Sequence, residues 1–360
     1  MTLPDSNVLP GPLWLFTALH VLTLSMHFAA MNFLLGGILI VIAGRFERRW
    51  ENPTARRFIA LFPAAMAITV TLGVAPLLFL QAVYPRQMYS AAIVSAWFWG
   101  LIIPVVILAY YFLYAASFAG NRDASGKARF LWPALLGLLY VSLVYSSVFS
   151  MAERPDVIQR LYAQNQTGWQ WNPEVGDYLI RWLHMILGAL TVGGFFVGVL
   201  GKDDPETFPI AKRMFGYGVA AAAAAGLAYV ASLGELMASL MRTPAIWALA
   251  GGIFLSLGSL HLFFKRRFLV SGLALFASLI LMVITRHQLR LVKLRGHFDP
   301  ASWRIAPQWS PLLLFLVFLI IAMVIVGIML RLFFRPSTTS QLGLARRDSG
   351  GGFHERNQAD

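Results

Sequence analysis

Long apolar runs separated by short polar segments dominate the chain. Several runs exceed the ~18 uninterrupted apolar residues that mark a membrane-spanning helix. Breakers such as Asn52-Pro53, Asp204-Pro205 and Asp299-Pro300 lie in the segments between them. The pattern predicts an all-α fold, a polytopic membrane helical bundle of about nine transmembrane helices. The expected spans are 13–43, 58–83, 92–118, 130–150, 177–200, 212–240, 245–264, 268–289 and 308–333.

Composition supports the same class. Hydrophobic residues make up 58% of the chain and charged residues 12%, against roughly 45–50% and about 25% in soluble domains. The net charge of +13 would suggest nucleic acid in a soluble chain. Here basic loops on the cytoplasmic side of a membrane explain it better, and we expect no nucleic-acid partner.

The distribution of Lys and Arg predicts the orientation. With the N-terminus outside, the inner loops and tail hold most of the basic residues, so the positive-inside rule places the C-terminus in the cytoplasm. The first ten residues carry no basic segment, which argues against a cleaved signal peptide. We therefore expect a single transmembrane bundle over 1–335 and a disordered cytoplasmic tail over 336–360.

Four histidines fall near or within the outer half of the predicted membrane. His20 and His27 are seven residues apart on the first span, so both point from one helix face, ~10 Å apart along the axis. His184 on the fifth span is expected level with His20, and His287 at the outer end of the eighth. Ionisable residues at membrane depth are costly and usually functional.

Haem ligation is the chemistry that needs this arrangement. The chain has no cysteine, which excludes disulfides, a Cys-held iron–sulfur cluster and CxxCH attachment of c-type haem. Imidazoles on apolar helices can bind haem iron axially, while Arg181, Arg286 and Arg290 are available for the propionates. The alternative is structural: each histidine hydrogen-bonds a backbone carbonyl across a helix interface. Several histidines at matched depth beside arginines favour haem.

Several stretches resemble subunit I of cytochrome bd quinol oxidases, and the chain is similar to a divergent member of that family. The similar stretches are Phe16-Thr17-Ala18-Leu19-His20, Leu72-Gly73-Val74-Ala75, Arg181-Trp182-Leu183-His184, Ser232-Leu233-Gly234-Glu235 and Arg286-His287-Gln288. The resemblance implies that His20 is the axial ligand of an outer-face haem in a high-spin pair. It also implies that His184 is one ligand of a low-spin haem b.

The resemblance and the extra histidines together predict two or three haem b groups, a bacterial inner-membrane location and redox partners. His27 and His287 are additional to the family pattern and are candidate iron ligands. For the second ligand to the iron at His184, we consider His287, Met237 and Met241, and Glu235 lies close by in sequence. The expected partners are a second membrane subunit and a periplasmic or multihaem cytochrome c.

Departures from the family affect the expected reaction. The connection after the sixth span is short, and the predicted third span, 92–118, contains no Asp or Glu. We find Glu235 as the carboxylate well inside a predicted span and Glu153 at a span boundary. Since oxygen reduction needs a proton route, we favour an electron-transfer subunit between outer-face partners. The alternatives are an active terminal oxidase, which passes electrons from quinol or cytochrome c to oxygen, and a non-redox transporter or scaffold with structural histidines.

The outer segment 286–304 departs from the positive-inside pattern. We expect Arg286 and Arg290, four apart on one helix face, to pair with propionates. Lys293, Arg295 and Arg304 are expected to form a positive dock for an acidic redox partner. The alternative is a solvated basic loop.

Overall fold

The computed structural model describes residues 8–46, 53–118 and 124–333. It divides into two compact units, residues 1–305 and 306–360. The predicted disordered tail, 336–360, lies outside the described residues. The second unit contains α13 (Trp309–Phe333), a helix of apolar residues over the predicted ninth span.

The described chain forms an all-α helical bundle, as predicted. Eight of its helical segments are long and apolar enough to cross a membrane, which agrees with a multi-pass membrane protein. The ninth span stays a prediction. The long helices of the first unit are α1 (Leu13–Phe46), α2 (Pro53–Val83), α5 (Ile102–Phe118), α6 (Ala124–Met151), α8 (Val175–Leu200), α9 (Thr207–Ser232), α11 (Ala245–Phe264) and α12 (Phe268–Leu294).

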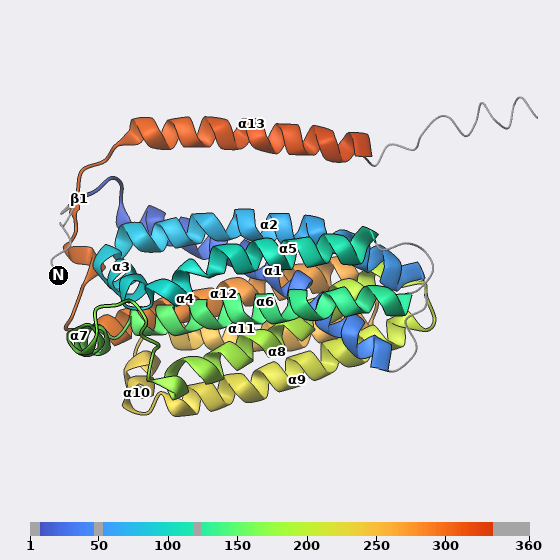
Figure 1. Ribbon diagram of the computed structural model, residues 1–360, viewed down its shortest axis with the longest axis horizontal. Coiled ribbons are helices and arrows are strands. Elements are labelled where there is room, and N and C mark those ends of the chain that lie inside the picture. Colours follow the sequence, from blue (N-terminus) through green and yellow to red (C-terminus); the bar gives the residue numbers. More distant parts are fainter. Residues whose placement is uncertain (1–7, 47–52, 119–123, 334–360) are drawn as a thin grey trace, which may run out of the picture. The chain divides into compact units, whose positions relative to one another are not determined.

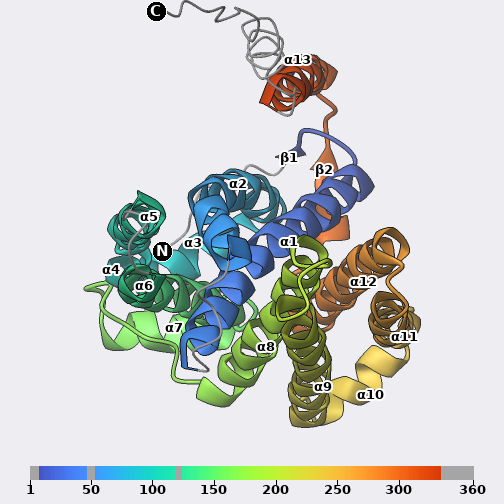
Figure 2. The same cartoon turned by 90° about the vertical axis from the view of Figure 1, so that its right-hand side faces the viewer.

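Helix α1 is central to the first unit. It packs against α2, α8, α12 and α6, and Figure 2 shows it between α2 and α8. Further helix pairs, α8 with α9, α11 with α12 and α5 with α6, complete the bundle. Residues from α1, α2, α5, α6, α8 and α9 share one apolar core, which includes Leu34, Phe62 and Leu113. The central position of α1 explains why its histidines lie among other helices.

Short elements gather at the end of the bundle where α1 begins (Figure 1). They are α3 (Pro85–Val94), α4 (Ala96–Gly100), α7 (Pro155–Gln164), α10 (Glu235–Met241), the 3-10 turn η1 (Pro300–Ser302) and the strands β1 (Val8–Leu9) and β2 (Arg304–Ile305). The two strands pair in parallel, with Val8 opposite Arg304. Helix α7 is amphipathic, buries Val157 and Leu161, and was not predicted.

Two predicted spans are broken. The span expected over 212–240 ends at Ser232, and α10 follows after Gly234, whose φ of +53° suits glycine. The span expected over 92–118 begins in the last residues of α3 and continues as α4 and then α5. Helix α12 in turn extends five residues beyond the predicted end, to Leu294. These changes reposition Glu235 and the last basic residues of α12.

Glycines let the central helices approach closely. A Cβ on Gly218 of α9 would lie 2.5 Å from the backbone nitrogen of Thr191, and one on Gly194 of α8 would lie 2.6 Å from that of Phe215. A Cβ on Gly36 of α1 would overlap the backbone of Ala189. Such contacts are typical of small-residue interfaces in membrane proteins. They fix α8 against both α1 and α9.

Candidate functional site

His20 and His27 lie on the side of α1 that faces α2. The Nδ1 atom of His20 is 3.1 Å from the carbonyl oxygen of Pro76, and Nδ1 of His27 is 3.0 Å from that of Thr69. His20 is only 4% exposed. Next to His27, Gly73 makes room for the ring, because a Cβ there would lie 2.9 Å from Cε1 of the imidazole. The predicted common face of the two histidines is therefore confirmed as a face against one neighbouring helix.

His184 repeats this arrangement between α8 and α9. Its Nδ1 atom lies 2.7 Å from the carbonyl oxygen of Ala222. Gly226, one turn further along α9, leaves the space that the ring occupies, since a Cβ there would be 3.0 Å from both Cε1 and Nδ1. The imidazole is thus held in a fixed orientation between two membrane-spanning helices.

The three hydrogen bonds define the tautomer of each neutral imidazole. A backbone carbonyl only accepts, so the nitrogen that faces it must carry the hydrogen. Nδ1–H then donates, and Nε2 keeps its lone pair. Metal-binding histidines commonly donate their other ring nitrogen in this way, often to a backbone carbonyl. The donor set of His20, His27 and His184 therefore fits binding of a haem iron through Nε2. The same carbonyl hydrogen bonds are those expected of structural histidines, so both interpretations agree with the geometry.

His287 differs from the other three. It lies on α12, is partly exposed, and its Nδ1 atom is buried without a hydrogen-bond partner. His287 and Arg290 are near enough to His20 to interact with it electrostatically. The guanidinium of Arg290 also lies over the ring of Tyr84, 5.6 Å from its centroid. Helices α1 and α12 pack against each other, so the histidines predicted on the first and eighth spans lie on neighbouring helices.

Glu153, which follows α6, is the buried centre of the arginine cluster. Its Oε1 atom accepts a hydrogen bond from Arg286 and one of 3.3 Å from Nε of Arg290. Its Oε2 atom lies 3.9 Å from Nη1 of Arg181 and 3.8 Å from Nζ of Lys293. Glu153 is 1% exposed. Three of its four cationic neighbours come from α12 and one from α8. We call Glu153 with Arg181, Arg286, Arg290, Lys293 and Asp177 the charged cage.

Asp177 and serines of α6 complete the cage. Lys293 donates to Oδ1 of Asp177 over 2.5 Å, and Ser150 donates to Oδ2 over the same distance. Arg181 donates through Nη2 to the carbonyl oxygen of Ser146 over 2.6 Å. The cage therefore ties α6, α8 and α12 together at the end of the bundle.

Burial and charge act in opposite directions on Glu153. Burial alone would raise the pKa of this carboxyl because the charged form loses its hydration. The four surrounding cations outweigh burial and hold the pKa below its ordinary value of 4.5. Glu153 is therefore ionised at neutral pH and compensates part of the cationic charge.

The remaining predicted site residues, Glu235, Met237 and Met241, lie on α10, after the end of α9. Glu235 is exposed at the start of α10, so the prediction that it lies well inside a span is wrong, because the helix ends before Gly234. Met237 packs against an apolar cluster that includes Leu240 and Leu289, while Met241 is 56% exposed. Their proposed roles as haem neighbours stay predictions.

The basic residues of segment 286–304 differ from the prediction in which of them are buried and which are exposed. Lys293 was predicted to dock a partner, but its side chain is 3% exposed and paired with two carboxylates. The extension of α12 to Leu294 directs it into the cage. Arg295 and Arg304 are exposed. A docking surface in this segment would therefore use Arg295 and Arg304 without Lys293.

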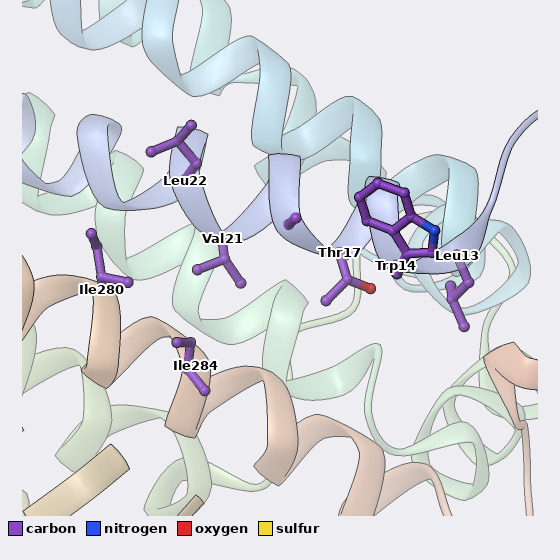
Figure 3. Close-up of a pocket in the computed structure, with 8 residues that line it drawn as sticks. Leu13, Trp14, Thr17, Val21, Leu22, Ile280 and Ile284 are labelled. Carbon is purple, nitrogen blue, oxygen red and sulfur yellow. The ribbon is translucent and has the colours of Figure 1, made fainter. Parts of the chain in front are cut away.

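An apolar groove of about 620 Å³ opens between α1 and α12. Figure 3 shows Trp14, Thr17 and Val21 of α1 across from Ile280 and Ile284 of α12. The volume lies within the ~300–1,000 Å³ typical of small-molecule sites. Its lining is almost entirely apolar, which suits a hydrocarbon chain better than a charged ligand. The groove and the charged cage would therefore bind different kinds of ligand.

No three His, Asp or Glu side chains gather in the described residues as a site for a metal ion. A haem iron needs fewer protein ligands than a bare metal ion, because the porphyrin supplies the other donors. No protein-family model matches the chain, and no curated protein does. The assignment of function therefore depends on the chemistry of the residues.

Proposed function

We propose that the chain is a haem b-containing electron-transfer subunit of a membrane oxidoreductase similar to cytochrome bd. His20 and His184 would hold two haems through Nε2, and His27 or His287 would supply further ligands. The observation that carries the proposal is the shared orientation of His20, His27 and His184, each donating from Nδ1 to a backbone carbonyl. Haem b supplies one-electron transfer at its iron.

The bundle itself sets the position and insulation of the haems. Apolar helices exclude water from the imidazoles, and close packing at Gly36, Gly194 and Gly218 prevents the ligand-bearing helices from sliding. The complex includes a second membrane subunit and a periplasmic or multihaem cytochrome c, and it lies in a bacterial inner membrane. Exposed Arg295 and Arg304 provide a positive surface for an acidic partner.

An electron-transfer role is favoured over a terminal oxidase by the placement of carboxylates. Among the described residues, Glu153 and Asp177 lie at the end of the bundle where α1 begins, and Asp203, Asp204 and Glu206 lie in the turn before α9 at the other end. The helical segments between these two levels contain no Asp or Glu. A proton path for oxygen reduction normally uses such groups or water within the membrane.

Spectroscopy of histidine variants tests the proposal. Purified His184→Ala should lose a low-spin component from the reduced-minus-oxidised haem b spectrum, because the imidazole that would hold this haem is removed. The matched control is His261→Ala, an exposed histidine in the last turn of α11, which should leave the spectrum unchanged. A structural histidine makes the same carbonyl hydrogen bond, so equal spectra for wild type and His184→Ala would contradict the role of His184.

Oxygen uptake separates the proposal from the oxidase alternative. With quinol or reduced cytochrome c as donor, the purified complex should reduce its haems without sustained oxygen consumption. Rapid, cyanide-sensitive uptake that depends on His20 would assign the chain to the terminal oxidases instead.

A further inference from the structure

The charged cage holds more positive than negative charge. Four cationic side chains, from α8 and α12, surround two carboxylates, Glu153 and Asp177, so the charged cage has two positive charges in excess. Arg181 and Arg290 are each 6% exposed, and the side chain of Lys293 is 3% exposed. Uncompensated charge at such depth costs several kcal/mol per ion. Binding of an anion would therefore stabilise the charged cage by offsetting the excess positive charge.

Hydrogen bonding in the cage is also incomplete, mostly on the side of the donors. The Nη1 atoms of Arg181, Arg286 and Arg290 are buried without a hydrogen-bond partner, and so is one acceptor, Oε2 of Glu153. The hydroxyl of Tyr229 on α9 is also buried without a hydrogen-bond partner. A water molecule can accept from these N–H groups but cannot offset their charge. A guanidinium pairs best with carboxylate or phosphate oxygens, which do both.

We propose that the charged cage is a binding site for a dianionic oxygen ligand, either a pair of carboxylates or a phosphate monoester. Two negative charges match the excess. The carboxylates would be the propionates of a porphyrin held at the neighbouring histidines, and the phosphate would belong to a phosphatidate-type headgroup at the membrane surface. Only the porphyrin source rests on the proposed function, because the charge excess exists without any haem.

The test measures binding of two probes to full-length protein in detergent, expressed without added haem. The first probe is haem b, compared with its dimethyl ester, in which both propionates are neutral. The second is inorganic phosphate, with the unfolding temperature as readout. If propionates occupy the cage, the wild type binds haem b roughly tenfold or more tightly than the ester, as expected for a buried charged hydrogen bond. If phosphate does, phosphate raises the unfolding temperature.

Arg290→Gln should abolish whichever effect the wild type shows, because it removes one excess charge and one unpartnered nitrogen. The control is Arg160→Gln, which makes the same change at a side chain that is 54% exposed and paired with Glu174. It should bind both probes like the wild type. If Arg290→Gln fails to fold, Arg286→Gln makes the same test at a less buried member of the cage.

Failure of this inference and failure of the proposed function are distinguishable. Haem b and its ester binding equally well, with no effect of phosphate, would overturn the anion site and leave the haem proposal standing. Phosphate binding that depends on Arg290, in a protein that takes up neither porphyrin, would support the anion site and contradict the haem proposal. An effect of either probe that survives Arg290→Gln and Arg286→Gln would also overturn the anion site.

Discussion

At the scale of single residues, Glu153 holds the cationic side chains of the charged cage together. The arginines expected to pair with propionates instead contact this carboxylate in the described structure, across more than a hundred residues of sequence. Propionate binding does not require them to leave Glu153, since each arginine also has an unpartnered Nη1. The carboxylate therefore prearranges the cations and lowers their mutual repulsion.

Replacing Glu153 should destabilise the fold strongly. Glu153→Gln keeps the shape of the side chain but leaves the cationic neighbours without their central charge. Breaking a buried ion pair in this way costs about 3–5 kcal/mol. The matched variant Glu174→Gln, at a carboxylate that is 38% exposed in its side chain, should cost at most about 1 kcal/mol. Unfolding in detergent followed by circular dichroism makes the comparison, and equal losses would contradict the role of the cage.

The contribution of Glu153 should also depend on pH. Its pKa in the folded protein is lowered by the surrounding cations from the ordinary value, which the unfolded chain keeps. Stability from the ionised form is therefore fully present above the unfolded pKa and is lost as the pH falls through the folded pKa. The difference in unfolding temperature between wild type and Glu153→Gln should stay constant from pH 7 to about 5 and shrink below it. A difference that already shrinks between pH 7 and 6 would rule out this assignment.

The sequence predicted the residue types of the site better than their partners. Histidines and arginines in apolar segments stand out because ionisable groups are rare there. Glu153 was noted only as a boundary residue, since it follows the last turn of α6 and its partners are distant in sequence. Its signal was weak: one acid beside an apolar helix, with an unexplained excess of outer arginines elsewhere.

At the scale of helices, close approach by glycine positions the ligands. Gly218→Ala should destabilise the α8–α9 pair, because the new Cβ would meet the backbone of Thr191. Overpacking of this kind typically costs about 1–3 kcal/mol. Gly216→Ala, two residues earlier on the same helix, meets no atom within 4 Å and should be nearly neutral. Thermal unfolding of both variants is the measurement, and a neutral Gly218→Ala would contradict the observed packing.

Hydropathy predicted that the long helices exist, but it did not predict where a helix is interrupted. Gly234 breaks the sixth span through a positive φ, and the apolar residues after it form α10 within the same hydropathy run. Hydropathy cannot distinguish a bent run from a straight one. The amphipathic α7 was missed for the opposite reason, since it is short and lies outside every long apolar run.

At the scale of the whole molecule, the orientation stays a prediction that labelling can check. Because the chain has no cysteine, a single introduced cysteine is the sole site that a thiol reagent can label. Trp169→Cys, at an exposed position near α7, should react with a membrane-impermeant maleimide in intact spheroplasts, because we place this end outside. Lys202→Cys, in the turn before α9 at the other end, should react only after permeabilisation. The reverse pattern would show that the charge distribution was misread.

The central claim is that this bundle binds haem b, and the pyridine haemochrome assay measures it most directly. Wild-type protein, expressed with haem available and purified in mild detergent, should contain two or three haem b per chain. Simultaneous replacement of His20 and His184 by Ala should remove most of it while the helix content is retained. A wild-type protein that is folded, monodisperse and colourless would contradict the account.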